Sequence, residues 1–297
     1  MNNHVLALGF FDGVHLGHGA LIRRTRERAE ELGMIPAVLT FDVHPDTLVF
    51  GKAVPLITSP EDRAELIRSR FGVEEIFSLR FDENLMRMPW DRFVEWIREE
   101  FSARHLVCGH DFTFGWKGEG TAEKLQAKCI ELGMGCDVMP EVQVDGETVS
   151  STRIRSLLLE GNVREAARYL GHPHALTDTV RTGFRLGRKL GAPTVNMRFA
   201  EGVLVPAKGV YAGRLRIEGE TVDRWAVTNI GVRPTVSDGD EVSVESYILD
   251  YDGNLYGKRI RLELLEFLRP EQRFSDTEAL KAQIARDTQR VRDYAGL

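Results

Sequence analysis

The hydrophobic pattern of this chain changes character once, and that change limits the folds that it can adopt. In the first half, short β-rich runs alternate with segments of helical periodicity, beginning with a strand at 5–9 and a helix at about 17–32. Beyond residue 179, successive strands are separated by glycine and Asp-Gly turns. We therefore expect an α/β domain with a mostly parallel sheet covered on both faces, followed by a small antiparallel sheet or barrel.

The domain limits follow from the breaks in this pattern. A helical stretch after Ser151 is expected to run through 157–170, and the Gly-His-Pro-His segment beyond it should end that helix. We predict a first domain over residues 1–170, a linker over 171–178 and a second domain over 179–297. With 297 residues, the chain can form two domains with separate cores.

The last predicted element is a helix over about 276–294. Ser275 and Glu278 before and within it have the spacing of a capping box. Its apolar residues recur at helical spacing, so the helix should pack on the second domain through one face.

The charge and cysteine content exclude several classes of protein. A formal net charge of −6 argues against a protein that coats nucleic acid or an anionic membrane, because such binding needs a broad excess of lysine and arginine. The first residues are not basic, and the apolar run after them is broken by Gly9 and Asp12, so we expect neither a signal peptide nor a membrane span. Three cysteines, none in a C-x-x-C pair, predict buried thiols in a reducing compartment. We expect a cytoplasmic protein, and the pattern favours no particular oligomeric state.

A glycine- and histidine-rich run, GFFDGVHLGH at 9–18, lies between the first predicted strand and the first predicted helix. An open α/β sheet places ligands at this position, where the amides of a helix N-terminus face an anion. The glycines allow a nucleotide to approach the backbone, and His15 and His18 can donate to phosphoryl oxygens as charge develops at an α-phosphate. A bare H-x-G-H also fits a helix cap beside a glycine turn.

A second glycine-rich segment, GFRLGRKLG at 183–191, carries three cations. Such a loop can fold over phosphates, and it also fits an exposed basic turn. The residues that follow it, Ala192 to Asn196, contain a Pro-Thr pair that helps to choose between a phosphate-binding loop and an exposed basic turn.

These segments resemble the motifs of one known family. The run at 9–18 is similar to the G-x-F-D-G-x-H-x-G-H signature of the HIGH-type nucleotidyltransferases, in the form found in bacterial bifunctional riboflavin kinase/FMN adenylyltransferases. Residues 192–196 resemble the G-F-P-T-A-N motif of riboflavin kinases, although Ala192 and Val195 stand where the family usually has Phe and Ala. Further segments resemble the family in the same order: 40–45, 109–115, 150–155, 229–235, 251–258 and 267–274.

The resemblance implies a Rossmann-like HIGH-type nucleotidyltransferase domain with a parallel sheet, followed by a small antiparallel β-barrel riboflavin kinase domain with a C-terminal helix. It also implies a bifunctional enzyme of flavin cofactor biosynthesis. The C-terminal domain would phosphorylate riboflavin to FMN with ATP, and the N-terminal domain would adenylylate FMN to FAD with release of pyrophosphate. Mg²⁺ would accompany ATP, and the flavins would be substrates and products.

The same resemblance assigns roles to individual residues. Catalytic roles fall on His15, His18, Arg153 and Glu245, with Glu245 as the base for the riboflavin 5′-hydroxyl. Thr194 and Asn196 would coordinate Mg²⁺ through oxygen, which suits that cation. Flavin contacts would come from Asp42, Arg269 and Glu271. ATP would be bound by Gly9, Phe10, Phe11, Asp12, Gly13, Gly109, Asp111, Ser151, Thr152, Gly183, Gly187, Arg188, Lys189 and Pro193.

Simpler interpretations of these residues stay open. Ser151 also fits a plain helix cap, Asp42 a turn, and Glu245 an outward-facing strand residue. At the level of function, the chain could retain only one of the two activities, or bind flavin as a regulator without turnover. The H-x-G-H feature by itself also fits a nucleotidyltransferase that acts on another phosphorylated substrate.

Overall fold

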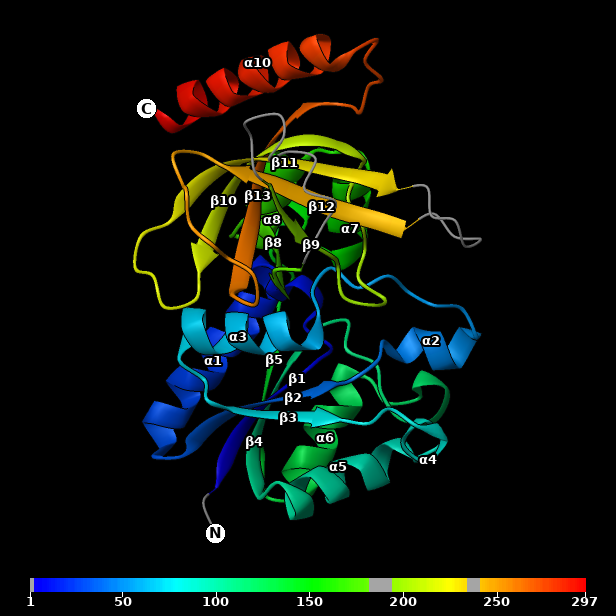
Figure 1. Ribbon diagram of the computed structural model, residues 1–297. Coiled ribbons are helices and arrows are strands. Elements are labelled where there is room, and N and C mark those ends of the chain that lie inside the picture. Colours follow the sequence, from blue (N-terminus) through cyan, green and yellow to red (C-terminus); the bar gives the residue numbers. More distant parts are fainter. Residues whose placement is uncertain (1–2, 182–193, 234–240) are drawn as a thin grey trace. The chain divides into compact units, whose positions relative to one another are not determined.

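The computed structural model describes residues 3–181, 194–233 and 241–297 (Figure 1). The chain forms two compact units, one made of Met1–Leu56 with Pro60–Ser151 and the other of Ile57–Ser59 with Thr152–Leu297. Within the described ranges, no helix has the length and apolar character needed to cross a membrane.

The first unit is built on a parallel sheet, as the alternation of strands and helices predicts. Strands that follow β1 in the chain are added first on one side of it and then on the other. The order of strands therefore reverses between β1 and β4, the position at which open α/β sheets bind ligands. The strand order is β3 (Glu75–Leu79), β2 (Ile35–Phe41), β1 (His4–Leu8), β4 (Ala103–Gly109) and β5 (Gly135–Met139).

Helices cover both faces of this sheet (Figure 1). Alternate side chains of β1 point to opposite faces. Val5 and Ala7 pack with α1 (Leu16–Leu32) and α3 (Pro60–Phe71). Leu6 and Leu8 pack with α5 (Trp90–Glu100) and α6 (Ala122–Glu131). The remaining elements of this unit are η1 (Asp12–Val14), α2 (Pro45–Phe50), α4 (Glu83–Met86), η2 (Trp116–Gly118) and the hairpin of β6 (Gln143–Val144) and β7 (Glu147–Thr148).

The second unit contains a curled antiparallel sheet that closes into a small barrel. Its edge strands are β8 and β9, and Arg181, just after β8, bridges to Asn196 of β9. The backbone N–H of Arg181 donates to the Asn196 carbonyl over 3.1 Å, so the two edges meet. The strand order is β8 (His174–Thr179), β13 (Arg259–Arg269), β10 (Gly209–Ile217), β11 (Arg224–Arg233), β12 (Glu241–Ile248) and β9 (Thr194–Met197).

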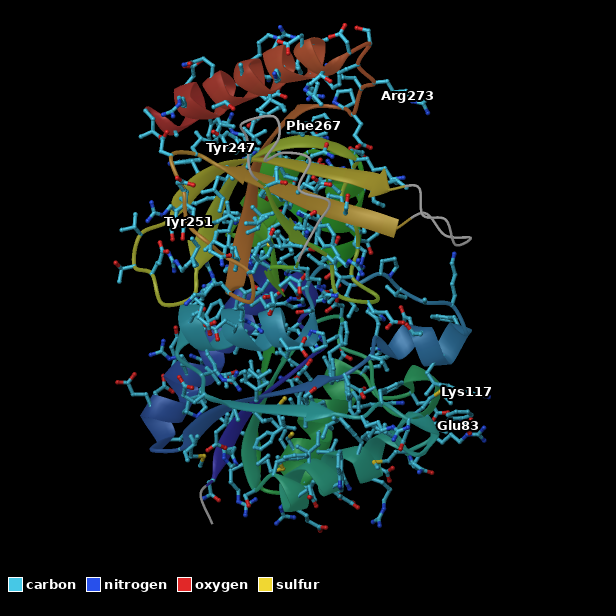
Figure 2. The ribbon with its side chains drawn as sticks, in the orientation of Figure 1. Glu83, Lys117, Tyr247, Tyr251, Phe267 and Arg273 are labelled. Atoms are coloured by element: carbon cyan, nitrogen blue, oxygen red, sulfur yellow. The ribbon has the colours of Figure 1, made fainter. Side chains whose placement is uncertain are left out.

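A helical hairpin precedes the barrel in the chain, where one continuous helical stretch was predicted to begin after Ser151 and run through 157–170. That prediction is wrong: α7 (Ser151–Leu159) and α8 (Val163–Leu170) are separate helices. Gly161 has φ +82 between them, and a Cβ there would lie 3.2 Å from the Phe267 ring of β13 (Figure 2 labels Phe267). The left-handed backbone therefore needs glycine and brings the turn against the barrel.

The limits of the compact units differ from the predicted domain limits. Helix α8 packs on β8 and β13, and the hairpin groups with the barrel in the compact unit that begins at Thr152. The domain limits at residues 170 and 179 stay a prediction. Residues 174–179, which the sequence places largely in a linker, form strand β8 and pair with β13.

The final helix, α10 (Thr277–Ala295), packs on β10 and β11 through a face that includes Val291, as predicted. Its cap differs from the prediction. Asp276, not Ser275, accepts the backbone N–H of Ala279 at 2.8 Å. A carboxylate caps a helix N-terminus as well as a hydroxyl does and adds a favourable interaction with the helix dipole.

Two candidate active sites

The first unit has a pocket of about 300 Å³ at the carboxyl ends of β1 and β4. This is the position where the strand order reverses. Eleven of the residues that line it come from segments singled out in the sequence: Gly9, Phe11, His15, Gly17, His18, Gly109, His110, Asp111, Phe112, Ser150 and Ser151.

The loop from β1 to α1 has an unusual backbone. Phe11, Gly13 and Val14 all have positive φ, at 58°, 77° and 43°. Such conformations cost energy in residues other than glycine and persist only where packing holds them. Phe11 and Val14 are fully buried against α1 and α3, which fixes the loop. The backbone is therefore held rigidly beside the pocket.

The two histidines form a stacked pair. Their ring centroids are 3.5 Å apart and the planes are inclined by only 14°. His15 is the N-cap of α1, and its Nδ1 accepts the backbone N–H of His18 at 3.3 Å. Burial, followed by the charges of His15 and Arg63, holds the pKa of His18 well below its usual value. His18 is therefore neutral near pH 7, which allows the close stacking.

The loop also depends on Arg63, a residue that the sequence analysis did not single out. Arg63 is only 2% exposed, and its guanidinium lies over the Phe10 ring at 4.4 Å. It donates to the Phe10 carbonyl, which also accepts the hydroxyl of Thr40 at 2.8 Å. Burial lowers the pKa of Arg63 to about 10, so the group stays charged at neutral pH.

The β6–β7 hairpin forms a wall of the pocket that the sequence analysis also missed. Glu141 accepts the side-chain amide of Gln143 at 2.6 Å and the hydroxyl of Thr148 at 2.9 Å. Glu141 and Thr148 line the pocket together with Val142 and Val149. The hairpin sequence matches no motif that we singled out, and it lines the pocket only because the fold brings it there.

Some predicted residues of this site lie outside the pocket lining. Phe10, Asp12 and Gly13 belong to the β1–α1 loop, and the Asp12 carbonyl accepts the hydroxyl of Ser151 at 3.2 Å. Asp42 is exposed at the end of β2, where its carboxylate accepts the backbone N–H groups of Val43 and Phe81 at 2.8 and 3.0 Å. Thr152 and Arg153 follow Ser151 on α7, and the second compact unit begins with them.

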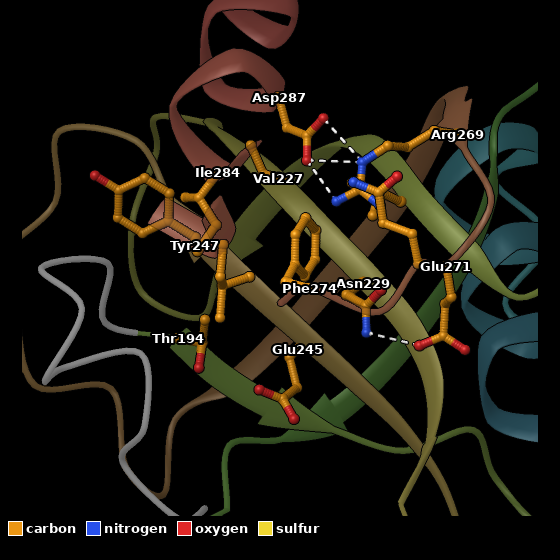
Figure 3. Close-up of a pocket in the computed structure, with 13 residues that line it drawn as sticks. Thr194, Val227, Asn229, Glu245, Tyr247, Arg269, Glu271, Phe274, Ile284 and Asp287 are labelled. Atoms are coloured by element: carbon orange, nitrogen blue, oxygen red, sulfur yellow. Dashed lines mark hydrogen bonds and ion pairs between the residues drawn. The ribbon is translucent and has the colours of Figure 1, made fainter. Parts of the chain in front are cut away.

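The second unit has its own pocket, of about 320 Å³, on the outer face of the barrel under α10 (Figure 3). Strands β9, β10, β11 and β12 supply its floor, and α10 with the segment after β13 supplies its cover. It is lined by Thr194, Val210, Val227, Asn229, Glu245, Tyr247, Arg269, Glu271, Gln272, Phe274, Leu280, Ile284 and Asp287.

Strand register brings the predicted chemistry of the barrel together. Glu245 of β12 lies directly opposite Asn196 of β9 and Asn229 of β11. Thr194 and Tyr247 form the next pair on the same face. Directly opposite residues on neighbouring strands share a face. Thus Thr194, Asn196 and Glu245, which are far apart in the sequence, occupy one patch of the sheet.

An ion pair ties α10 to the barrel beside this pocket. Arg269 donates to both carboxylate oxygens of Asp287, with the shortest contact at 2.7 Å (Figure 3). Asp287 is 1% exposed and also accepts the amide of Gln283 at 2.9 Å. The predicted flavin contact Arg269 therefore lies at the pocket, with part of its guanidinium engaged in holding the helix.

Glu271 crosses above the sheet to Asn229, whose side-chain amide donates to it at 3.4 Å (Figure 3). A Cβ on Gly231 would lie 2.1 Å from the Glu271 carboxylate. The glycine in the Asn-Ile-Gly segment therefore makes room for this carboxylate at the pocket. Gly183, Gly187, Arg188, Lys189 and Pro193 lie outside the described residues.

Taken together, the two units define a two-domain nucleotide-dependent transferase, with a histidine pair at the switch point of a parallel sheet and a carboxylate–amide patch on a small barrel. Comparison with family models agrees. A model described as FAD synthetase matches residues 1–153, and one described as riboflavin kinase matches residues 170–295. The chain belongs to the bifunctional riboflavin kinase/FMN adenylyltransferase family.

Proteins of that name are similar over nearly their whole length. The one from Listeria monocytogenes is 37% identical, covering 98% of this chain and 92% of that protein. Those from Bacillus subtilis and Escherichia coli K12 are 33% and 34% identical, covering 98% and 99% of this chain and 92% and 93% of theirs. The crystal structure of a macrolide-efflux protein from Streptococcus pneumoniae matches with a TM-score of 0.87 and 30% identity, covering 98% of this chain and 94% of that one.

Proposed function

We propose that this chain makes FAD in two consecutive ATP-dependent steps. The barrel transfers the γ-phosphoryl group of ATP to the 5′-hydroxyl of riboflavin, and the α/β unit transfers AMP from a second ATP to the FMN so formed. The pairing of Glu245 with Asn196 across β12 and β9 carries this proposal. By itself, the histidine pair would fit a nucleotidyltransferase that acts on any phosphorylated acceptor. The barrel adds a second site that can phosphorylate a hydroxyl, so the acceptor for adenylylation would be the FMN that the barrel produces.

In the adenylylation step, an FMN phosphate oxygen attacks the α-phosphorus of ATP and the bond to pyrophosphate breaks. His15 accepts at Nδ1 from the backbone of His18, so its neutral ring carries the proton on Nε2. His18, also neutral, keeps one N–H donor. Donors placed where charge develops stabilise the transition state, and no protein nucleophile is required.

Pyrophosphate leaves toward the start of α7 in this proposal. Ser151 lines the pocket and opens the helix, whose free amides favour an anion. Thr152 adds a hydroxyl, and Arg153 adds a planar cation that can bind two phosphate oxygens. Gly109 and Asp111 would contact the nucleotide and Asp42 the flavin.

In the kinase step, Glu245 orients the riboflavin hydroxyl and accepts its proton as the oxygen attacks the γ-phosphorus. In the strand register Asn196 lies opposite Glu245 and Thr194 lies two residues along the same edge strand, and the side-chain oxygens of both would fit Mg²⁺. The ion, when bound with ATP, neutralises charge on the transferring group. We assign the phosphate-covering role to the segment that contains Gly183, Gly187, Arg188, Lys189 and Pro193 from its motif alone.

The pocket beneath α10 has the properties needed for a flavin ring. Val227, Tyr247 and Phe274 supply apolar surface, and Asn229 supplies a polar group near Glu245. Binding pockets for such ligands combine apolar walls with a few placed polar groups. Arg269 and Glu271, at the rim, are proposed flavin contacts.

The proposal is tested with the purified full chain and Mg-ATP, with products separated by chromatography. Riboflavin should yield FMN and then FAD, and FMN supplied alone should yield FAD with pyrophosphate. If folded protein converts only riboflavin or only FMN, the chain is a monofunctional enzyme. Flavin binding without ATP consumption would support a regulator. Adenylylation of nicotinamide mononucleotide or phosphopantetheine in preference to FMN would indicate another acceptor.

A further inference from the structure

The pocket of the first unit contains a carboxylate that two hydrogen bonds hold in place. Glu141 lines this pocket, just beyond the end of β5. One of its oxygens accepts the side-chain amide of Gln143 at 2.6 Å, and the other accepts the hydroxyl of Thr148 at 2.9 Å. Each carboxylate oxygen can accept two hydrogen bonds, so both keep a lone pair that a ligand can use.

The hairpin that holds this carboxylate is closed by a tight turn. Gln143 and Thr148 lie directly opposite each other in the β6–β7 pair. Between the strands, Asp145 and Gly146 both have positive φ, at 52° and 82°. Positive φ at both central residues is typical of the two-residue turns that match the twist of a β-hairpin. The two donors to Glu141 are therefore fixed relative to each other, and the carboxylate has a defined orientation.

The order of strands separates Glu141 from the histidine pair. His15 and His18 follow β1, whereas Glu141 follows β5, and β4 lies between these two strands. Neighbouring strands are about 4.8 Å apart, so these side chains start from strand ends about 10 Å apart. A carboxylate repels phosphate. In the proposed adenylylation, on which this inference rests, the triphosphate therefore lies toward the histidines and the nucleoside lies toward Glu141.

The surroundings of Glu141 fit a nucleobase better than a ribose. Pro140, Val142 and Val149 line the same wall of the pocket and supply apolar surface. A flat heterocycle packs on such a surface, whereas ribose hydroxyls need polar partners. The two polar side chains of the wall can only accept, because a carboxylate has no proton and the Thr148 hydroxyl already donates to Glu141. A base that meets this wall must therefore present an N–H donor.

We propose that Glu141 selects the nucleobase of the adenylylation step by accepting a hydrogen bond from the exocyclic amino group of adenine. Adenine has this donor at C6, whereas guanine has a carbonyl oxygen there, as hypoxanthine does. A carbonyl oxygen would face the carboxylate as one acceptor against another. A site that binds a substrate N–H in this way rejects an analogue that lacks it. Glu141 is thus a specificity-determining residue and takes no part in the transfer itself.

The test gives the folded full chain FMN, Mg²⁺ and an equimolar mixture of ATP and ITP, and separates the flavin dinucleotides by chromatography. In such a competition, the ratio of the two products equals the ratio of the two kcat/KM values. Because Glu141 is exposed and water competes with the base, we expect the adenine product to exceed the hypoxanthine product by about tenfold. Purine riboside triphosphate, which has hydrogen at C6, should compete as poorly as ITP. Equal use of ATP and purine riboside triphosphate would overturn the proposal.

Variants of the hairpin assign this preference to the carboxylate. Glu141→Gln keeps the shape of the side chain and adds an N–H that can pair with a C6 carbonyl, so the ATP-to-ITP product ratio should fall by about tenfold. Thr148→Val removes a donor that orients the carboxylate and should lower the ratio by a smaller factor. It decides the question if Glu141→Gln fails to fold by circular dichroism. Glu147→Gln, exposed on the same hairpin and outside the pocket lining, is the matched control and should keep the wild-type ratio.

The remaining outcomes separate this inference from the function on which it rests. A wild-type chain that forms no flavin dinucleotide would overturn the proposed function and this inference together. FAD formation with an unchanged product ratio in Glu141→Gln would overturn the inference alone. If Glu141→Gln alters the preference for ATP over 2′-deoxy-ATP and leaves the ATP-to-ITP ratio unchanged, the carboxylate binds the ribose and the assignment to the base is wrong.

Discussion

The guanidinium of Arg63, on α3, donates a 2.9 Å hydrogen bond to the carbonyl oxygen of Phe10, in the loop that carries the histidine pair. The same group donates at 2.6 Å to the carbonyl of Phe41, the last residue of β2. One buried cation thus joins the ends of two neighbouring strands at the pocket edge. Asp12 and Asp42 lie near enough to favour its charged form.

Replacing Arg63 by methionine should slow adenylylation, because the loop that carries the histidine pair loses one of its supports. The change keeps an apolar stem but removes the donors to both carbonyls, each worth about 1.5–3 kcal/mol when the donor is charged. We expect FAD formation to fall by about 10–100-fold and the kinase step to be unchanged. Steady-state rates of each step, with thermal unfolding, measure this. Arg68→Met, exposed on the same helix, is the control, and equal effects from both variants would refute a positioning role.

His18→Ala should nearly abolish FAD formation while FMN formation continues. Loss of one preorganised donor to a developing oxyanion costs about 10²–10³-fold in rate. The side chain lies at the pocket of the first unit, and riboflavin kinase chemistry is proposed in the other. Separate assays with riboflavin and with FMN measure the two steps. His110→Ala, at the rim of the same pocket, should have a much smaller effect. Equal loss of both steps in a stable variant would contradict two independent sites.

Glu245→Gln should produce the reverse pattern. The amide keeps the shape of the side chain but cannot accept the proton of the riboflavin hydroxyl, and loss of a general base costs about 10²–10⁴-fold. FMN formation should fall by that factor, with riboflavin affinity little changed, and FAD formation from supplied FMN should be retained. Isothermal titration calorimetry with riboflavin, and separate kinetic assays of each step, compare the variant with the wild type. Unaltered kinase activity would remove Glu245 from the mechanism.

Much of the fold could be predicted because the local pattern agrees with the tertiary structure. The first strand was predicted at 5–9 and the first helix at about 17–32, and β1 (His4–Leu8) and α1 (Leu16–Leu32) lie within a residue of those limits. Strand β9 was missed. It is a four-residue edge strand directly after a glycine-rich segment, so its pattern alone resembles a loop. Its pairing with β12, rather than its sequence, makes Thr194 and Asn196 part of a site.

Sequence analysis singled out the site residues that belong to motifs. It missed the residues whose position at the site depends on tertiary contacts. His15 and His18 were singled out from the H-x-G-H pattern and Glu245 from the resemblance to a family, and these side chains line two pockets. Arg63 was missed because a charged residue in an amphipathic helix is usually exposed. Its burial depends on the carbonyl groups of Phe10, in the loop after β1, and Phe41, at the end of β2, which lie 53 and 22 residues away in the sequence. Such partners are brought together by the tertiary structure, so the sequence around Arg63 shows no pattern that predicts them.

A different histidine should control the acid stability of the barrel. His174, on β8, is 1% exposed and stacks on Phe199, and neither ring nitrogen has a hydrogen-bond partner within the described ranges. Burial, followed by the charges of His172 and Arg261, lowers the pKa of His174 to about 3. The unfolded chain binds a proton near pH 6.5 and the folded chain does not, so unfolding becomes more favourable as pH falls from 6.5 toward 3.

His174→Leu should therefore weaken the loss of stability in acid. Between pH 7.5 and 5 the histidine should lower the free energy of unfolding by about 2 kcal/mol, at roughly 1.4 kcal/mol per pH unit below 6.5, and leucine removes this contribution. At pH 7.5 the variant should be at least as stable as the wild type, because leucine leaves no buried polar atom unpaired. Urea unfolding at the two pH values, compared with the exposed-site control His110→Leu, measures the difference. An unchanged pH dependence in His174→Leu would show that His174 becomes protonated without unfolding the barrel.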